Sequence, residues 1–371
     1  MKVWPVFGVF VLQVFLLLAH WFLFLTIVHF LAVGGTAERL LGAALLVLAL
    51  SFVAAAFWSY RHANTLVALV YKAAAVWLGF LNFLFWAACL CRLAELGLWL
   101  AGKDTPEARA TVGVALFGLA VLAGAYGLVN ARRIRERKVT VSLPGLPEGW
   151  RGRTALLVSD LHLGHVNGAG FAGRVSGIAR RLNPDIVFIA GDLFDGSKVD
   201  ARRLAGPLFE LEPPLGMYFC GGNHEDFGDA AGFEQALRGA GIRVLHNERV
   251  NVNGLEVIGV SYRDAAYPMH LRAFLDGLGL NGTPSVLLNH VPSRLPIVEQ
   301  AGVTLQLSGH THGGQILPFT WITRRAFGKY THGLHRFGRM QVLTSSGAGT
   351  WGPPMRVGSD AEVVLITFAS A

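Results

Sequence analysis

The chain has 371 residues, of which 53% are hydrophobic and only 15% are charged, with a formal net charge of +8. Its mean hydropathy of +0.45 is too high for a disordered protein or for one that is soluble throughout its length. A disulfide-based scaffold is also excluded, because Cys89 and Cys91 lie in an apolar run and only Cys220 lies in the globular part.

The charged residues are unevenly distributed along the chain. The first 130 residues contain seven of the 32 Lys and Arg residues and four of the 24 Asp and Glu residues. We therefore predict a membrane region over residues 1–131, a basic juxtamembrane linker over residues 132–149 and a globular domain over residues 150–371. The positive charge of the globular part is a modest excess spread over many positions, so nucleic acid is not expected as a partner.

Four apolar stretches cover most of the first part, at about residues 3–33, 40–60, 66–91 and 110–130. Each has at least the roughly 20 residues that cross a bilayer as a helix, so we predict four transmembrane helices. The first stretch is too long for a signal peptide and has only Lys2 before it. We expect it to stay uncleaved and to anchor the protein.

The positive side chains between the apolar stretches predict the orientation of the chain. If both termini are cytoplasmic, seven of these side chains face the cytoplasm and four face the opposite side. The seven include a basic run in which each cation gains about 1 kcal/mol next to anionic lipid. This run consists of Arg132, Arg133, Arg135, Arg137 and Lys138. We therefore predict a multi-pass protein of the inner (cytoplasmic) membrane with its globular domain in the cytoplasm.

Several polar residues lie within the apolar stretches, and such residues often belong to a transport path. Here ordinary structural roles are favoured. Lys72 lies near a helix start and can extend to the membrane surface, while His20 and His29 can be satisfied by one another or by a helix interface. Cys89 and Cys91 alone make a poor metal site, and the stretches lack the several buried carboxylates that a proton relay needs.

The globular part contains five apolar runs that each end in polar residues. Ligand sites in open α/β sheets lie where strands end, so these residues can converge although they are far apart in the sequence. Glycines such as Gly164, Gly191, Gly222 and Gly309 flank them and allow tight turns and a close approach of the backbone to an anion. The residues at the five ends are Asp160 and His162, Asp192 and Asp195, Asn223 and His224, His290, and His310 and His312.

These residue types indicate a metal site. Any one of the pairs alone reads most simply as a turn at a strand end, but five ends in register indicate a common site. With Asp195 and His224 set aside, two aspartates, an asparagine and four histidines remain, with no thiolate among them, and these suit divalent Mn, Fe, Zn, Ni or Co.

In this order the motifs D-x-H, G-D-x-x-D, G-N-H-[DE], a lone H and G-H-x-H resemble those of the calcineurin-like metallophosphoesterases, over about residues 150–371. The run Gly309–Gln315 and the preceding membrane part are most similar to the membrane-linked YkuE-type branch, which includes animal transmembrane proteins with such a domain. The alternation of strands and helices indicates an α/β sandwich of mixed sheets. The resemblance implies the four-layer (α+β) form of that sandwich.

The resemblance also implies a site with two divalent metal ions. Ions about 4 Å apart clamp a phosphate and lower the pKa of a bridging water. One ion would be held by Asp160, His162 and His312, the other by Asn223, His290 and His310, with Asp192 bridging both. His224 would donate to the phosphate or to the leaving oxygen, oriented by Asp195, which is typically worth about 10² to 10⁴ in rate.

Two motifs depart from the family pattern. Asp195 is followed by Gly196 and Ser197, whereas the Ser/Thr phosphatases have Asp-Arg-Gly, so a phosphate-gripping arginine is missing and protein phosphatase activity is not expected. Residues 345–347 read Ser-Ser-Gly, where the membrane-linked branch commonly has Ser-Arg-Gly. His165, Arg324 and Arg325 are the candidates to contact substrate. Arg356 is a further candidate, and all three arginines are expected at the surface.

The segment from Trp321 to Phe337 mixes aromatic with basic residues. Such a segment can stack on single-stranded nucleic acid, lie on the membrane interface or form an ordinary loop packed on the core. The membrane anchor favours the interface.

Together these features predict a membrane-anchored dinuclear-metal phosphoesterase that hydrolyses a phosphoester or pyrophosphate bond of a lipid-linked substrate. The resemblance suggests a phospholipid headgroup ester or UDP-diacylglucosamine, which related enzymes of the superfamily cleave, and a membrane tether raises the effective concentration of the enzyme at such substrates. One alternative is a general phosphodiesterase acting on cyclic nucleotides or nucleic acid. The other is a non-catalytic membrane sensor or transport accessory.

Overall fold

The structure is a computed structural model that describes residues 3–280 and 282–371. The chain divides into two compact units. The first contains Met1–Val129 together with Gly352–Met355, and the second contains Asn130–Trp351 together with Arg356–Ala371.

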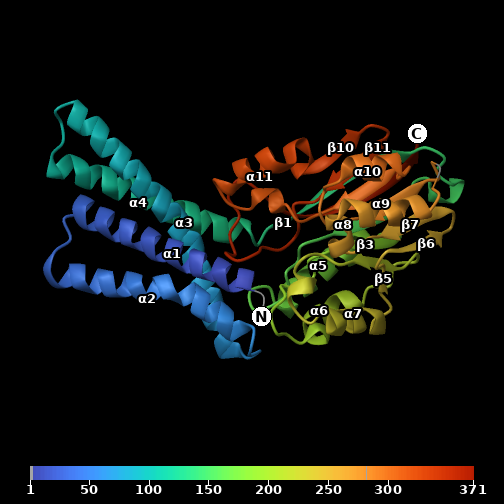
Figure 1. The fold of residues 1–371 in the computed structure, drawn as a ribbon, viewed down its shortest axis with the longest axis horizontal. Coiled ribbons are helices and arrows are strands. Elements are labelled where there is room, and N and C mark those ends of the chain that lie inside the picture. Colours follow the sequence, from blue (N-terminus) through green and yellow to red (C-terminus); the bar gives the residue numbers. More distant parts are fainter. Residues whose placement is uncertain (1–2, 281) are drawn as a thin grey trace. The chain divides into compact units, whose positions relative to one another are not determined.

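The first unit consists of four helices, which run side by side (Figure 1). All four are long and apolar enough to cross a membrane, which agrees with the four predicted spans. Helix α3 continues to Leu100, beyond the predicted end at residue 91. The helices are α1 (Val3–Phe30), α2 (Gly35–Ser59), α3 (Thr65–Leu100) and α4 (Pro106–Asn130).

Polar side chains within these helices satisfy one another. His20 accepts a hydrogen bond from Nε1 of Trp77 at 2.9 Å, and its Nδ1 lies 2.7 Å from the Leu16 carbonyl, to which it donates. Near the end of α3, the carboxylate of Glu95 pairs with His29 and with Arg92. His20 and His29 are thus satisfied by Trp77 and Glu95 instead of by one another.

The second unit contains two six-stranded mixed sheets. The first has the strand order β1-β12-β2-β3-β4-β5, in which β2 to β5 are parallel. Its strands are β1 (Ile134–Leu143), β2 (Thr154–Val158), β3 (Ile186–Ala190), β4 (Met217–Cys220), β5 (Arg243–Val244) and β12 (Ala361–Ser370). The second has the order β10-β11-β9-β8-β7-β6. Its strands are β6 (Glu248–Val252), β7 (Leu255–Gly259), β8 (Ser285–Leu288), β9 (Leu305–Ser308), β10 (Gly333–Phe337) and β11 (Met340–Thr344).

The central strands are apolar on both faces because each face is covered. Alternate side chains of a strand point to opposite faces. In β2, Ala155 and Leu157 pack in the cluster between the two sheets, whereas Leu156 and Val158 pack against the helices outside. Because both faces of β2 are buried, the strand is a continuous apolar run in the sequence.

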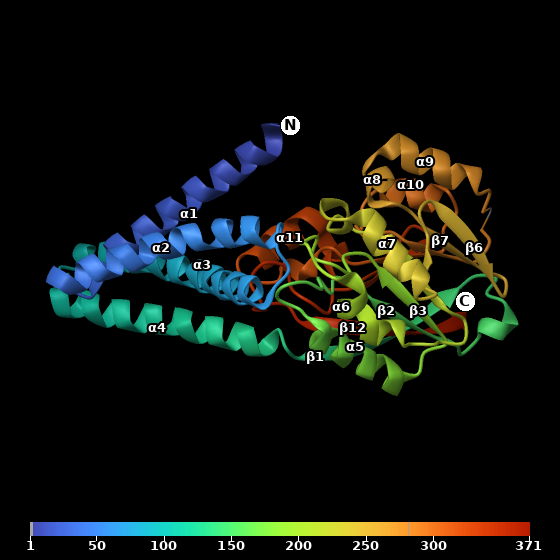
Figure 2. The ribbon, with the colours of Figure 1, turned by 90° about the horizontal axis from the view of Figure 1, so that it is seen from below.

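Helices cover the outer faces, so the predicted four-layer sandwich is confirmed (Figures 1 and 2). Helices α5 to α7 pack on the first sheet, and α8 to α10 pack on the second. The helices are α5 (Ala169–Leu182), α6 (Ala201–Phe209), α7 (Ala230–Gly239), α8 (Tyr262–Ala266), α9 (Pro268–Gly277), α10 (Leu295–Gln300) and α11 (Phe319–Phe327), with short 3₁₀ turns at Glu148–Trp150, Glu225–Phe227, His312–Gly314 and Gly328–Thr331.

Strand β1 lies within residues 132–149, the segment expected to be a linker. It pairs with β12 along its whole length and so belongs to the first sheet. Arg135 forms an ion pair with Asp360, and Nε of Arg137 lies 3.2 Å from a carboxylate oxygen of Glu362. Part of the basic run therefore stabilises the sheet edge. The extended, charged sequence looked like a linker because its partner strand is more than 200 residues away.

Trp150 ties β12 to the second sheet. Its side chain is fully buried, its ring packs edge-on against Phe368 at 5.3 Å, and its Nε1 donates to the Val252 carbonyl at 3.0 Å.

We expect Trp150→Ala to lower the unfolding midpoint of the full chain in detergent by roughly 10 °C, because a buried tryptophan contributes about 3 to 5 kcal/mol. Circular dichroism would measure it. Trp150→Phe, which keeps a ring, should lower it by less; equal losses would contradict the packing role.

Candidate metal centre

The five predicted polar ends come together at one edge of the two sheets. Three of them follow the adjacent parallel strands β2, β3 and β4, and the other two follow β8 and β9 of the second sheet. Backbone hydrogen bonds join the ends: the amide of Asp160 donates to the Gly191 carbonyl at 3.1 Å, and that of Gly309 to the His290 carbonyl at 2.9 Å. The carboxyl ends of the strands thus form one continuous site.

Five of the site residues have a left-handed backbone conformation, which turns the chain sharply as it leaves a strand. They are Asp160 (φ 52°), His162 (φ 47°), Asp192 (φ 50°), His310 (φ 68°) and His312 (φ 50°). Such a conformation costs about 1 kcal/mol or more for each residue with a Cβ atom. Strain of this kind collects at functional sites, where the surrounding structure enforces it.

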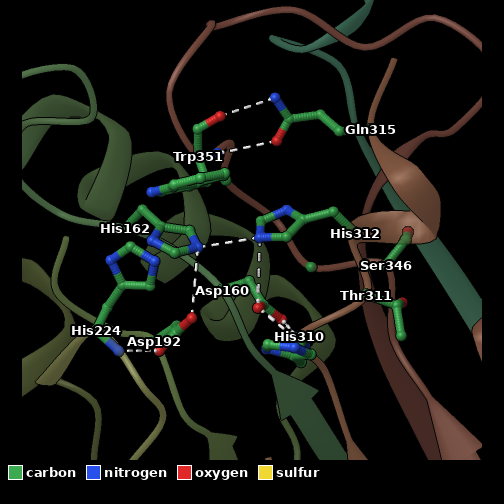
Figure 3. A network of polar contacts seen from close by, with 12 residues as sticks. Asp160, His162, Asp192, His224, His310, Thr311, His312, Gln315, Ser346 and Trp351 are labelled. Atoms are coloured by element: carbon green, nitrogen blue, oxygen red, sulfur yellow. Dashed lines mark hydrogen bonds and ion pairs between the residues drawn. The ribbon is translucent and has the colours of Figure 1, made fainter. Parts of the chain in front are cut away.

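The turns aim nitrogen and oxygen atoms at common points. Three groups of three residues have donor atoms that all lie within 4.8 Å of one another. Asp192 belongs to two of them, and Nε2 of His162 lies 3.0 Å from Nε2 of His312 (Figure 3). The groups are Asp160, His162 and His312; His162, Asp192 and His224; and Asp192, His290 and His310.

Hydrogen bonds orient two of the histidines. Nδ1 of His290 donates to the Ala190 carbonyl at 2.7 Å, which leaves Nε2 turned toward Asp192, 3.2 Å from its Oδ2. A hydrogen bond from Nδ1 to a backbone carbonyl fixes the tautomer that presents Nε2 to a metal. Nδ1 of His310 lies 3.0 Å from Oδ1 of Asn223, so Asn223 lies next to the group formed by Asp192, His290 and His310.

The pKa values of the buried groups show how the charge is balanced. Burial, supported by the charge of Asp192, raises the pKa of Asp160 to about 6. Burial alone would raise the pKa of Asp192 as well, but His290 and its other histidine neighbours hold it below the usual range. Burial by itself would lower the pKa of His290, but the negative charges of Asp192 and Asp160 outweigh burial and raise this pKa to about 10. Burial lowers the pKa of His162 to about 3 and that of His310 to about 4.

These groups fit bound divalent cations. Asp160 and Asp192 are nearly inaccessible to water, and the pKa of His290 is raised whereas those of His162, His310 and His312 are lowered. Buried carboxylates of this kind are paired or coordinate metals. A divalent ion would replace the proton of His290 in balancing Asp192, and neutral His162, His310 and His312 are already in the form that ligates metals.

Glycines leave the space that the two carboxylates occupy. A Cβ atom on Gly222 would lie 2.2 Å from Oδ1 of Asp192, and one on Gly309 would lie 2.2 Å from Oδ2 of Asp160. The sequence suggested that these glycines admit a bound anion. In the structure they make room for the carboxylates of the site itself.

His224 is the third member of the group that contains His162 and Asp192. Its ring packs edge-on against His162 with 4.6 Å between the centroids, and its Nδ1 lies 3.0 Å from the backbone carbonyl of Asp195, to which it donates. The carboxylate of Asp195 accepts instead from the amide and hydroxyl of Ser197. Burial raises the pKa of the Asp195 carboxyl, although hydrogen bonds from Ser197 and from the backbone of His165 partly offset this effect. His165 therefore lies next to Asp195.

Glu225 is a site residue to which the sequence analysis assigned no role. Its buried carboxylate accepts from the amides of Asp192, Phe194 and Gly222 at 2.7 to 3.0 Å. Glu225 therefore joins the ends of β3 and β4 and fixes the backbone that carries Asp192. Burial and the charge of Asp192 raise its pKa to about 7. Its signal in the sequence is the acidic position that ends the G-N-H-[DE] motif.

Arg356 is buried, so the expectation that it lies at the surface is wrong. Its side chain is fully buried, and its guanidinium donates to the carbonyls of His312 at 3.1 Å and Ser346 at 2.7 Å. Its Nη2 also lies 3.4 Å from Nδ1 of His312. Burial lowers its pKa only to about 10, so it stays charged at neutral pH. Arg356 thus supplies a cation beside the 345–347 segment, which lacks an arginine of its own. No local pattern marks a buried arginine, so sequence reasoning missed it.

Trp351 is a further residue that the sequence did not single out. The side chain of Gln315 holds its backbone, donating to its carbonyl at 3.0 Å and accepting from its amide at 2.9 Å (Figure 3). Its indole is 59% exposed and lies edge-on to the ring of His224, with 5.8 Å between the centroids. An exposed aromatic ring therefore borders the site. The two predicted substrate residues Arg324 and Arg325 are exposed on α11.

A model of the calcineurin-like phosphoesterase family matches residues 154–314. A transmembrane protein with metallophosphoesterase domain from Danio rerio is 35% identical over 328 residues, which cover 82% of this chain and 74% of that protein. An uncharacterized metallophosphoesterase from Aquifex aeolicus is 35% identical over 260 residues, covering 67% of this chain and 97% of that protein. The uncharacterized metallophosphoesterase YkuE from Bacillus subtilis is 27% identical over 272 residues, covering 68% of this chain and 93% of that protein.

The space at Gly222 gives a direct test of the site geometry. We expect Gly222→Ala to displace the Asp192 carboxylate and to lower the metal content of the purified protein well below the about two ions per chain of a dinuclear site. Elemental analysis by mass spectrometry would measure it. The matched control is Gly221→Ala, since a Cβ atom on Gly221 would meet nothing within 4 Å. If both variants bind as much metal as the native protein, Asp192 does not lie where the structure places it.

Proposed function

Because the chain belongs to the calcineurin-like metallophosphoesterases and is a membrane-linked, metal-dependent phosphoesterase, we propose that it hydrolyses a phosphoester or pyrophosphate bond of a lipid-linked substrate. The observation that carries the proposal is that two of the donor groups share Asp192, one of them together with His224. Such an arrangement suits two ions on either side of one carboxylate.

The residues divide between two divalent ions by their distances. Asp160, His162 and His312 would hold one ion, and His290, His310 and Asn223 the other, with Asp192 between them. Their nitrogen and oxygen atoms suit Mn, Fe, Zn, Ni or Co. When bound, such ions clamp a phosphate, activate a water and neutralise the charge of the transition state. Glu225 and Arg356 would keep the backbone of this site in place.

His224 is positioned to act on the leaving group. Its Nδ1 donates to the Asp195 carbonyl, and its Nε2 would give a hydrogen bond or a proton to the leaving oxygen. Asp195 would orient His224 through its backbone, since its carboxylate is engaged by Ser197. Asp195 is therefore a positioning residue in this proposal.

An amphiphilic substrate, such as UDP-diacylglucosamine or a phospholipid headgroup ester, fits two features of the chain. Four membrane-length helices precede the catalytic unit, and a tether to the bilayer raises the effective concentration of lipid substrates. Trp351 places an exposed ring beside His224, where it can stack on a base or contact an acyl chain. Arg132 and Arg133, ahead of the sheet, and Lys138, on β1, are exposed, which supports a cytoplasmic catalytic unit at the inner membrane.

Hydrolysis by the detergent-purified full chain tests the proposal. We expect turnover to require a divalent ion and to be faster with UDP-diacylglucosamine than with a chromogenic monoester or diester. Asp192→Asn should abolish metal binding and turnover together. His224→Ala should leave the metal bound and lower kcat by about 10² to 10⁴, since it removes only the proton donor.

The matched control is His270→Ala, because His270 is an exposed histidine on α9. It should change neither metal content nor rate. Bound metal without turnover of any phosphoester would instead support the sensor alternative. Preferred cleavage of a nucleotide diester, with strong salt dependence, would support the general phosphodiesterase.

Trp351 tests the substrate class separately. Trp351→Ala should lower kcat/KM for the lipid-linked substrate by up to about tenfold, because one aromatic contact is worth about 0.5 to 1.5 kcal/mol. The chromogenic monoester should be affected by less than about twofold. Trp351→Phe, which keeps a ring, should restore most of the loss. A loss of equal size for both substrates would show that Trp351 supports the fold of the site and does not select the substrate.

A further inference from the structure

Helix α11 carries an exposed apolar surface next to the metal centre. None of its nine residues, all of which the structure describes, is buried. Three large apolar side chains are strongly exposed: Phe319 (49%), Trp321 (69%) and Ile322 (59%). Exposed apolar side chains that gather in this way mark a site of interaction with a partner or a membrane.

The pattern on α11 is that of a helix lying flat on a surface. Phe319 and Ile322 are three residues apart and therefore share one side of the helix. Trp321 and Arg325, four residues apart, share an adjacent side, which also faces solvent. The exposed surface of α11 thus combines apolar and aromatic side chains with guanidinium groups.

The stretch of sequence that contains α11 carries only positive charges. From Ala301 to Ser359 the sequence contains no aspartate or glutamate. Arg324, Arg325 and Lys329 are all exposed. A surface of this composition is complementary to an anionic partner, and Trp and Arg together are typical of helices at the headgroup level of a bilayer.

The structure favours a bilayer over single-stranded nucleic acid. Tyr330 and Phe337, which the sequence groups with Trp321, pack against the hydrophobic cluster of the second sheet. Phe327 is only partly exposed and lies edge-on to His310. Few rings of this segment therefore remain exposed to solvent. Binding of single-stranded nucleic acid would need several exposed rings, on which successive bases stack. A bilayer, in contrast, is supplied by the four membrane-length helices of the same chain.

We propose that α11 docks on the surface of an anionic bilayer, with Phe319, Trp321 and Ile322 at the headgroup and acyl boundary and Arg324, Arg325 and Lys329 at lipid phosphates. This inference deepens the proposed function, because it names the lipid surface from which an amphiphilic substrate would reach the site. It rests on surface chemistry and does not require catalysis.

The backbone of α11 is joined to the turn that carries two metal-site histidines. A Cβ atom on Gly314 would lie 2.3 Å from Cα of Thr320, so helix and turn are in direct backbone contact. The hydroxyl of Thr311, between His310 and His312, donates to the Thr331 carbonyl at 2.7 Å just after the helix. Lipid contact at α11 would therefore hold this edge of the site at the bilayer.

Lipid quenching of a fluorophore on the full chain tests the docking. We would place an environment-sensitive label at Ile322→Cys in a Cys89→Ala background, since Cys91 and Cys220 are buried. The protein is reconstituted in nanodiscs of phosphatidylcholine with about one third phosphatidylglycerol, containing a headgroup nitroxide lipid. The matched control is a label at Met269→Cys, because Met269 is an exposed apolar residue on α9 (82%).

We expect the label at position 322 to be quenched at least about threefold more than the label at position 269. Arg324→Glu combined with Arg325→Glu should abolish this difference, and thermal unfolding would verify that each variant is folded. Equal quenching at both positions would overturn the proposal. So would protection of position 322 by a single-stranded oligonucleotide or by a second copy of the chain, without lipid quenching. Because this readout does not use turnover, its failure is distinct from failure of the hydrolysis test.

Discussion

Two buried carboxylates govern the organisation of the catalytic unit. Asp160 and Asp192 lie side by side at the sheet edge, almost inaccessible to water, and their charges repel and lack hydration. Burying such a pair is strongly unfavourable unless cations or hydrogen bonds compensate it. The surrounding features of the site, from the raised pKa of His290 to the buried guanidinium of Arg356, are forms of that compensation.

The compensation is arranged in layers. Amides meet the carboxylates first, since the backbone of His310 donates to Asp160 and that of His224 donates to Asp192. Around them, Glu225 and Arg356 hold the loops mainly by hydrogen bonds to backbone atoms. The packed sheets then make these loops rigid, because Trp150, Leu157 and similar side chains fill the space between them. A site with this support is preorganised before it meets a ligand.

How much the sequence predicted depends on whether the information was local. Apolar runs that end in Asp, Asn or His identified the strand ends and the residues that meet there, since strand ends in an α/β sheet converge. Length and hydropathy likewise identified the four membrane helices. The role of β1 and the burial of Arg356 were missed, because each is decided by contacts with distant segments: β12 for the strand, and the 346–349 backbone for the arginine. The exposed ring of Trp351 also depends on such a contact, with Gln315.

The left-handed turns at Asp160, His162, Asp192, His310 and His312 bear on how this domain can change over evolutionary time. Asp and His can adopt this backbone conformation at each position, but glycine or asparagine would adopt it with less strain. The candidate metal ligands therefore adopt a conformation that their side chains disfavour, at a cost to folding. A descendant released from catalysis would gain stability by drifting to glycine at these positions. In this chain all five positions still carry Asp or His, so the backbone strain of the site is present in full.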